Sequence, residues 1–176
     1  METTVALRKM AERGNADAQF LLGYRLVFGR NRPRPTDWPA VAAYWHSAAE
    51  AGHSWAQFRL AISYREGDGV EQNDGMMLYW LEKAIKRRYP DAQRDLGVCY
   101  HVGRGVTVDD VKAVFWYKKA AGGGDRKAMY NLGLCYGAGD GVAASLRWAR
   151  FWFGKAAALG HRTARARLKR MENMGD

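Results

Sequence analysis

The sequence predicts an all-α solenoid built from stacked helix-turn-helix repeats with a 36-residue period. The first observation behind this prediction is that the same residue types return at a fixed step, and a period of about 20 to 50 residues is typical of stacked supersecondary units. The recurring positions are Ala56, Ala92, Ala128 and Ala164, then Trp80, Trp116 and Trp152, and then Ala48, Ala84, Ala120 and Ala156. The second observation is that apolar residues inside each period follow helical spacing.

The stretch 91–122 shows the helical pattern of one repeat most clearly. Ala92, Leu96 and Tyr100 fall on one face at about 100° per residue, and polar residues fall opposite, so we expect a two-sided first helix. The glycines of the segment 103–106 end this helix, because glycine tolerates the positive φ of a turn.

A second helix is predicted in each repeat by a residue that can cap it. The side chains at this position accept the free amides of a first helical turn. The four capping residues are Asp37, Asn73, Asp109 and Ser145, at 36-residue steps. In these second helices we expect Trp116 and Trp152 to be mostly buried, so that truncation of Trp116 would leave a cavity.

Taken in order, the elements form one predicted repeat domain over residues 1–176. The domain begins with a cap helix in 1–14, continues with repeats at 15–52, 53–88, 89–124 and 125–160, and ends with a cap helix in 161–176. The expected helix pairs are 16–28 with 38–51, 54–66 with 74–88, 90–102 with 110–122, and 126–138 with 146–159. The last helix keeps Ala164 and Leu168 toward the stack and is otherwise polar, as a terminal repeat requires.

The pattern A-x-x-x-L-G-x-x-Y-x-x-G-x-G-V, followed by a capping residue and W-Y-x-K-A-A, resembles the Sel1-like repeat, a relative of the tetratricopeptide repeat. The resemblance is strongest at 92–121 and 128–157. It is weaker at 56–85, where Ala61 and Leu81 replace the glycine and tyrosine, and weakest at 18–49, where the segment 30–35 replaces the glycine loop. The resemblance implies a right-handed α/α superhelix that binds another protein as an adaptor, regulator or inhibitor, including bacterial immunity proteins that neutralise a toxic effector.

The compartment and the thiols are predicted from simple features. No apolar run is long enough to span a membrane, and residues 1–14 carry charges where a signal peptide needs apolar residues, so we expect a cytoplasmic protein. We also expect a monomer. Because members of the resembled family are often exported, a removed signal peptide would make it periplasmic or secreted. Cys99 and Cys135 occupy equivalent sites of adjacent repeats, about 8 to 10 Å apart, beyond disulfide range, so we expect free thiols.

No motif for catalysis, a cofactor or a metal accompanies the repeats. The histidines His46, His53, His101 and His161 have no ligand spacing around them, and the glycine pairs of the loops complete no phosphate-binding motif. No serine stands in a nucleophile elbow. The sequence therefore predicts a protein that is not an enzyme and carries no cofactor.

Charge is the feature that says most about partners. The formal net charge is +10, and residues 143–176 hold eight basic and two acidic side chains. Further basic clusters are Arg30/Arg32/Arg34 and Lys83/Lys86/Arg87/Arg88. Such a field attracts anionic partners, and we expect a protein with an acidic surface. No nucleic-acid reading motif is present, which disfavours nucleic acid, and binding of RNA or another anionic surface is the alternative.

The first-helix face that does not pack on its own second helix is the predicted binding groove, because this face lines the concave side of tetratricopeptide-like solenoids. Phe20, Phe58 and Tyr130 share a position where the family has an aromatic residue, so packing and binding are equally good explanations there. Trp55 and Arg94 are the preferred binding residues, since their types are enriched at interface hot spots. The predicted groove residues are Phe20, Tyr24, Trp55, Phe58, Ile62, Arg94, Val98, His101, Tyr130, Leu134 and Arg170.

Overall fold

The computed structural model describes residues 2–29, 37–86 and 89–173, and this part of the chain forms ten α-helices and no strand. The predicted all-α fold of paired helices is therefore confirmed. The helices are α1 (Glu2–Glu12), α2 (Ala16–Phe28), α3 (Trp38–Glu50), α4 (Ser54–Glu66), α5 (Asp74–Ile85), α6 (Pro90–Val102), α7 (Asp110–Gly122), α8 (Arg126–Ala138), α9 (Leu146–Ala158) and α10 (Arg162–Asn173). The predicted cluster Arg30/Arg32/Arg34 with its loop, and Arg87 and Arg88, lie outside the described residues.

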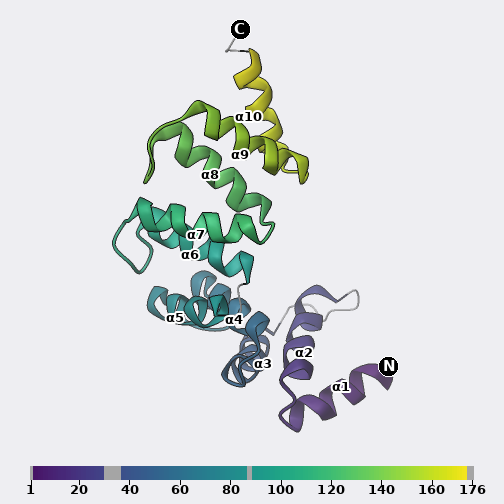
Figure 1. Ribbon diagram of the computed structural model, residues 1–176. Helices are drawn as coiled ribbons and strands as arrows, with labels where there is room; N and C mark the ends of the chain where they lie inside the picture. Colours follow the sequence, from purple (N-terminus) through teal and green to yellow (C-terminus); the bar gives the residue numbers. More distant parts are fainter. Residues whose placement is uncertain (1, 30–36, 87–88, 174–176) are drawn as a thin grey trace. The chain divides into compact units, whose positions relative to one another are not determined.

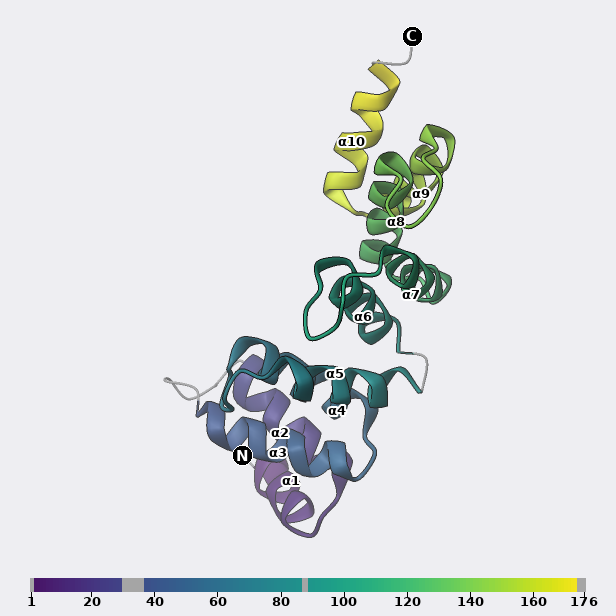
Figure 2. The ribbon, with the colours of Figure 1, turned by 90° about the vertical axis from the view of Figure 1, so that its left-hand side faces the viewer.

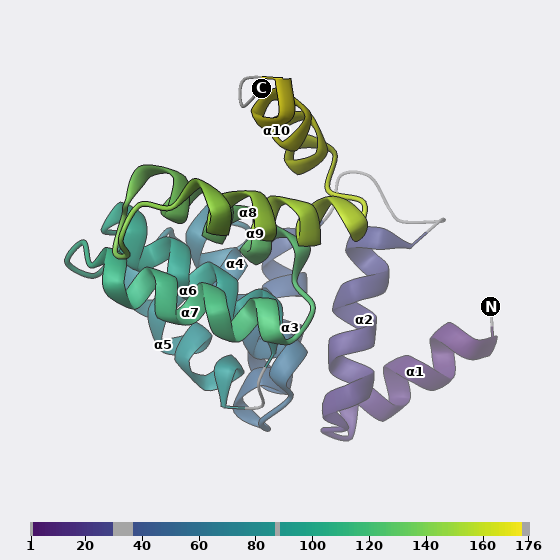
Figure 3. The ribbon, with the colours of Figure 1, turned by 45° about the horizontal axis from the view of Figure 1, so that its top comes forward.

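The chain divides into two compact units, Met1–Arg87 with α1 to α5 and Arg88–Asp176 with α6 to α10 (Figure 1). In each unit the first helix of a repeat packs on its second helix, α2 on α3 and α4 on α5, then α6 on α7 and α8 on α9. Each second helix inside a unit also packs on the next first helix, α3 on α4 and α7 on α8. The pair α4 and α5 lies side by side in Figure 2, and α10 follows α9 in Figure 3.

The predicted capping residues begin the second helices. The Asp37 carboxylate accepts the amide of Ala40 at 3.1 Å, and the Asn73 side chain accepts that of Met76 at 2.9 Å. In the later repeats Asp109 accepts from the amide of Lys112 at 2.9 Å and Ser145 from that of Trp148 at 3.3 Å. Because the same three-residue bond recurs with three residue types, the repeats conserve the acceptor and not the side chain.

The glycine loops are turns between helices. Gly67, Gly103 and Gly139 end α4, α6 and α8 in the left-handed region, with φ between 73° and 90°. A β-carbon on Gly141 would lie 2.1 Å from the carbonyl oxygen of Asp110, so the loop packs directly on the preceding repeat. Glycine is required at the helix ends because φ is positive there, and at Gly141 because a side chain would collide with the backbone of Asp110.

A glycine in three first helices makes room for an aromatic ring from the second helix. A β-carbon on Gly23 would lie 2.6 Å from the indole of Trp45. The equivalent contacts are 2.7 Å from Gly97 to Tyr117 and 2.5 Å from Gly133 to Phe153. In the second repeat Ala61 and Leu81 stand at these two positions, and both are buried. Alanine is larger than the glycine of the other repeats, and leucine is smaller than their aromatic residue. The two changes compensate each other in volume, which explains why the two departures from the repeat pattern occur together.

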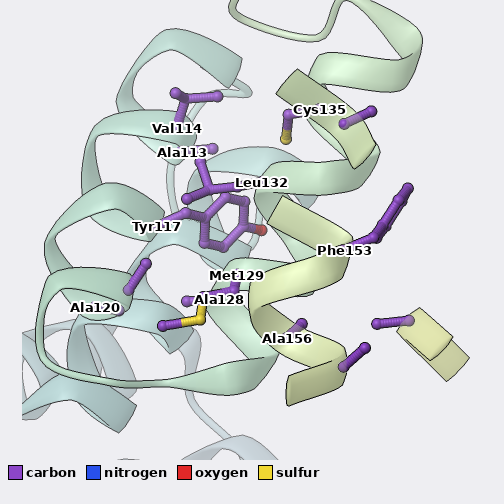
Figure 4. Packing of buried hydrophobic residues seen from close by; sticks show 14 residues of the cluster. Ala113, Val114, Tyr117, Ala120, Ala128, Met129, Leu132, Cys135, Phe153 and Ala156 are labelled. Atoms are coloured by element: carbon purple, nitrogen blue, oxygen red, sulfur yellow. The ribbon is translucent and has the colours of Figure 1, made fainter. Parts of the chain in front are cut away.

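The core of the second unit lies between α7, α8 and α9. Figure 4 shows Tyr117 reaching from α7 toward Leu132 of α8, with Val114 nearby and Phe153 approaching from α9. Burial raises the pKa of the Tyr117 hydroxyl. The ring is therefore part of the packing and not a titrating group near neutral pH.

Trp116 and Trp152 are mostly covered but not fully enclosed, in line with the expectation that they are mostly buried. The residue that follows each of them, Tyr117 or Phe153, takes the core position opposite the glycine. Each tryptophan is rotated by about 100° from that position and reaches the edge of the core. Trp80, by contrast, is buried.

Cys99 and Cys135 are not joined by a disulfide, as predicted from their equivalent positions, and both are buried. Burial raises the pKa of the Cys135 thiol to about 11. This cysteine is therefore protonated near neutral pH and acts as a small apolar residue.

Candidate protein-interaction faces

One position of the first helix forms the contact between neighbouring repeats, and we call it the seam position. It holds Phe20 in α2 and Tyr130 in α8. Phe20 stacks on His53, which precedes α4, with ring centroids 4.6 Å apart and planes inclined by 22°. Tyr130 stacks on His161 in the same way, at 4.6 Å and 14°. The seam position therefore packs one repeat on the next.

The two seam histidines also begin helices. Nδ1 of His53 accepts the amide of Ala56 at 3.1 Å, and Nδ1 of His161 accepts the amide of Ala164 at 3.2 Å. An accepting Nδ1 carries no proton, so both imidazoles are neutral in this arrangement. Burial, reinforced by the positive charge of Arg126 and Lys127, lowers the pKa of His161. His53 and His161 therefore stabilise the fold, each by capping a helix and by stacking on the preceding repeat.

Arg94 occupies the seam position of α6, and its partner there is a carboxylate. Its guanidinium donates to Asp125, the residue equivalent to His53 and His161, at 2.8 Å. It also donates to Asp91 at 2.7 Å and to Asp95 at 2.6 Å. Burial opposes the positive charge, but the carboxylates of Asp95 and Asp125 outweigh it and raise the pKa of Arg94. The side chain is 11% exposed, so its charge is satisfied inside the protein.

A group of rings around one guanidinium forms the most exposed part of the predicted groove in the first unit. Tyr24 lies 4.7 Å from Phe28, measured between ring centroids, and both rings are exposed. The guanidinium carbon of Arg59 lies 4.5 Å from the Phe28 centroid and 5.9 Å from that of Tyr24. Trp55 is 50% exposed and lies 6.5 Å from Phe20. We call Tyr24, Phe28, Trp55 and Arg59 the α2–α4 face.

Sequence reasoning missed two members of this face. Phe28 lies one helical turn after Tyr24, and Arg59 lies one turn after Trp55. The spacing of four residues, which places side chains on the same side of a helix, is the signal that could have found both. Of the other predicted residues of this unit, Phe58 is buried and Ile62 is half-buried.

Three of the predicted residues of the second unit meet at a hollow between α6 and α8. Val98, His101 and Leu134 line a hollow of about 230 Å³. Its other lining residues are Tyr117, Asn131, Cys135 and Asp140, of which none was predicted. His101 Nδ1 lies 2.6 Å from a carboxylate oxygen of Asp110, so the imidazole is held at the rim. Arg170 is exposed on α10 and is not among the residues that line this hollow.

The described residues offer no group of three or more histidine, cysteine or acidic side chains that could hold a metal ion. The cysteine at the hollow is protonated, and the histidine beside it is bonded to Asp110. The hollow therefore presents apolar walls with a few polar groups, a chemistry suited to recognising a side chain of a partner. Within the part of the chain that the structure describes, no helix combines the length and apolar character that a membrane span requires.

Comparison with known proteins identifies the repeat. A family model described as Sel1 repeat matches residues 16–53, 56–89, 90–125 and 126–161. A protective antigen of uropathogenic Escherichia coli with this repeat fold is 35% identical with a TM-score of 0.91, covering 98% of this chain and 36% of that one. A Sel1 repeat protein of Oxalobacter formigenes is 36% identical with a TM-score of 0.86, covering 96% of this chain and 48% of that one.

A more distant similarity extends to a cysteine-rich protein of Helicobacter pylori. Cysteine rich protein B is 27% identical with a TM-score of 0.60, and the match covers 76% of this chain and 96% of that one. No curated protein matches the chain. This chain spans less than half the length of the Escherichia coli and Oxalobacter proteins.

Proposed function

Because the chain belongs to the Sel1 repeat family, whose members are in general non-catalytic protein-interaction scaffolds, we propose that it binds another protein through the open faces of its first helices. The α2–α4 face provides the main contact. The hollow lined by Val98, His101 and Leu134 provides a second contact in the other unit.

The observation that carries this proposal is the exposed group of rings around Arg59. Aromatic and arginine side chains supply most of the binding energy at protein interfaces when they are surrounded by further contacts. Trp55 exposes half of its surface, and its indole has a large apolar area that a partner could cover. The seam position, by contrast, is occupied inside the fold, so Phe20 and Tyr130 contribute to binding mainly by positioning the helices that carry the face.

The net charge favours an acidic partner. A formal charge of +10 raises the association rate with an acidic protein surface, and apolar anchors then set the lifetime of the complex. A partner that places an apolar side chain against Trp55 and Phe28 fits this face, because both rings are exposed. An adaptor, an enzyme regulator and an immunity protein that inhibits a toxic effector would all use the face in this way.

Binding of RNA is the second candidate function, and one observation favours it. Residues 143–176 carry eight basic and two acidic side chains. If phosphates were the ligand, the logarithm of affinity would fall linearly with the logarithm of salt concentration, by about 0.7 per phosphate neutralised on a single strand. A protein complex anchored by Trp55 would keep a large part of its affinity at high salt.

Photocrosslinking from the face tests the proposal. A benzophenone amino acid replacing Trp55 is irradiated in nuclease-treated extract, and the captured protein is then purified and titrated against the unmodified chain. We expect Trp55→Ala to weaken this complex by at least about tenfold, roughly 1.4 kcal/mol. Trp148→Ala is the matched control, because it removes an equally exposed tryptophan (47%) from α9. Equal affinity of Trp55→Ala and the parent chain would contradict the proposal.

A further inference from the structure

The outer side of α9 carries an apolar strip that the fold does not cover. Trp148 and Phe151 lie about 60° apart around the helix, Leu159 directly follows its end, and all three are exposed. Phe151 meets two indoles edge to face, Trp148 at 5.3 Å and 84° and Trp152 at 5.2 Å and 81°. Leu146, at the first turn, is 68% exposed. We call Trp148, Phe151 and Leu159 the α9 strip.

Cations without acidic partners lie on α9 and on the adjoining helix α10. Lys155 Nζ lies 5.3 Å from the Phe151 centroid, and Arg147 is exposed in the first turn. The basic residues of α10, which packs on α9, are Arg162, Arg165, Arg167, Lys169 and Arg170. Among the described residues, none of these seven cations forms an ion pair with a carboxylate. Only Glu172 is acidic between the start of α9 and the end of α10.

We propose that the α9 strip, together with the basic residues of α9 and α10, binds the surface of an anionic phospholipid bilayer. Tryptophan, phenylalanine and leucine side chains on one side of a helix, together with lysine and arginine, are the combination that enters the boundary between head groups and acyl chains. The lysine and arginine side chains extend to the head groups while their stems lie along the apolar layer. Each basic residue near an anionic surface strengthens such binding.

The distribution of charge favours lipid over an acidic protein. The cations are spread over two helices on long side chains, with no carboxylate to fix them. Lipid head groups move laterally and can meet such dispersed cations one by one, whereas a folded partner would need acids at matching fixed positions. The charge pattern therefore fits an array of mobile phosphates better than one rigid acidic surface.

The geometry of the rings disfavours single-stranded nucleic acid. Stacking of a base needs an open ring face. Phe151 has a lysine ammonium over its ring and an indole on either side, at interplanar angles above 80°. These neighbours limit the stacking of a base on Phe151, whereas an acyl chain needs no open ring face.

Vesicle sedimentation tests the proposal. The full chain is mixed with vesicles of phosphatidylcholine alone, or with about one quarter of the lipid replaced by phosphatidylglycerol. We expect binding to the anionic vesicles and at least about tenfold weaker binding to the neutral ones. Trp148→Ala combined with Phe151→Ala should weaken binding about tenfold, and Arg147→Gln combined with Lys155→Gln should remove part of its salt dependence. Trp55→Ala should bind vesicles like the parent chain, because Trp55 is not part of the α9 strip. The lipid-binding proposal and the protein-binding proposal can therefore fail independently of each other.

A second measurement separates insertion from simple charge attraction. Lipids brominated on the acyl chain should quench part of the tryptophan fluorescence, and less of it in Trp148→Phe, which keeps a ring and should still bind. Absence of binding to anionic vesicles, or binding unchanged in the Trp148/Phe151 variant, would overturn the proposal. Competition by millimolar inorganic phosphate would overturn it in favour of a free-anion site. Strip-dependent binding of a single-stranded RNA, without vesicle binding, would overturn it in favour of nucleic acid.

Discussion

The seam position and the open face lie on the same first helices, yet they follow different rules. At the seam, Phe20 meets His53, Tyr130 meets His161, and Arg94 meets Asp125. The chemistry changes from ring stacking to an ion pair, but both partners change together and the side chains stay largely covered. On the open face, Trp55 leaves half of its surface exposed. The paired residues of the seam maintain the stack, and the exposed surface of Trp55 is what a partner could cover.

Breaking the ion-paired seam should give the largest effect. Arg94→Ala leaves Asp95 and Asp125, both nearly buried, without their cation. Removing one partner of a buried ion pair costs about 3 to 5 kcal/mol, so we expect the free energy of unfolding to fall by that amount in a urea titration. A loss below about 1 kcal/mol would show that the seam is not structural.

The control for Arg94→Ala transfers the last seam into the preceding one. The combined substitution Arg94→Tyr, Asp95→Asn and Asp125→His copies the set Tyr130, Asn131 and His161. It removes both buried carboxylates together with their cation, and the new histidine can still cap the helix as His161 does. We expect most of the lost stability to return. A triple variant as unstable as Arg94→Ala would contradict the equivalence of the two seams.

Filling the space beneath a core ring should have a smaller effect. A β-carbon on Gly133 would lie 2.5 Å from the ring of Phe153, so Gly133→Ala should cost about 1 to 3 kcal/mol by overpacking. Gly154→Ala is the matched control on the adjoining helix, because nothing lies within 4 Å of its added carbon. That change should stabilise the chain by about 0.5 to 1 kcal/mol through helix propensity. Thermal melting of both variants checks the opposite signs.

The stabilising contribution of the seam that contains His161 should depend on pH, because that seam uses a histidine. The seam formed by Arg94 and Asp125 contains no histidine. Since the pKa of His161 is lowered in the folded chain, its stabilising contribution is present above the unfolded value of about 6.5 and is lost as pH falls through the lower folded value. His161→Ala should cost about 0.5 to 2 kcal/mol at pH 7.5, the usual range for a helix cap, and less at pH 5. Urea titrations at both pH values measure this difference. A cost that stays constant or grows as pH falls would contradict the neutral cap.

Much of the fold could be predicted because its signals are local. Caps such as Asp109 and the turn glycine Gly103 act within a few residues, so the helix ends follow directly from the chain. Which of Trp116 and Tyr117 is fully enclosed in the core could not be predicted, since two adjacent apolar residues compete and only the space over Gly97 decides for Tyr117.

The faces were harder to predict than the helices. The helix register was enough to place Tyr24 and Trp55 on the exposed face. It was also enough to bring Val98 and Leu134 to the same side of the repeats, where both line one hollow. The role of Arg94 depends on Asp125, 31 residues away, and on three carboxylates meeting one guanidinium. Its register was the available clue, because it stands 36 residues before Tyr130. A position shared with a packing residue indicates packing even when the residue type suggests recognition.

The most direct test of the account measures stability and affinity on one variant. Trp55→Ala should change the free energy of unfolding by about 1 kcal/mol or less, because the indole is half exposed. The same variant should raise the dissociation constant for the protein captured through position 55 by at least about tenfold in isothermal titration calorimetry. A large loss of stability with unchanged affinity would contradict the account, because Trp55 would then belong to the packing and not to the binding face.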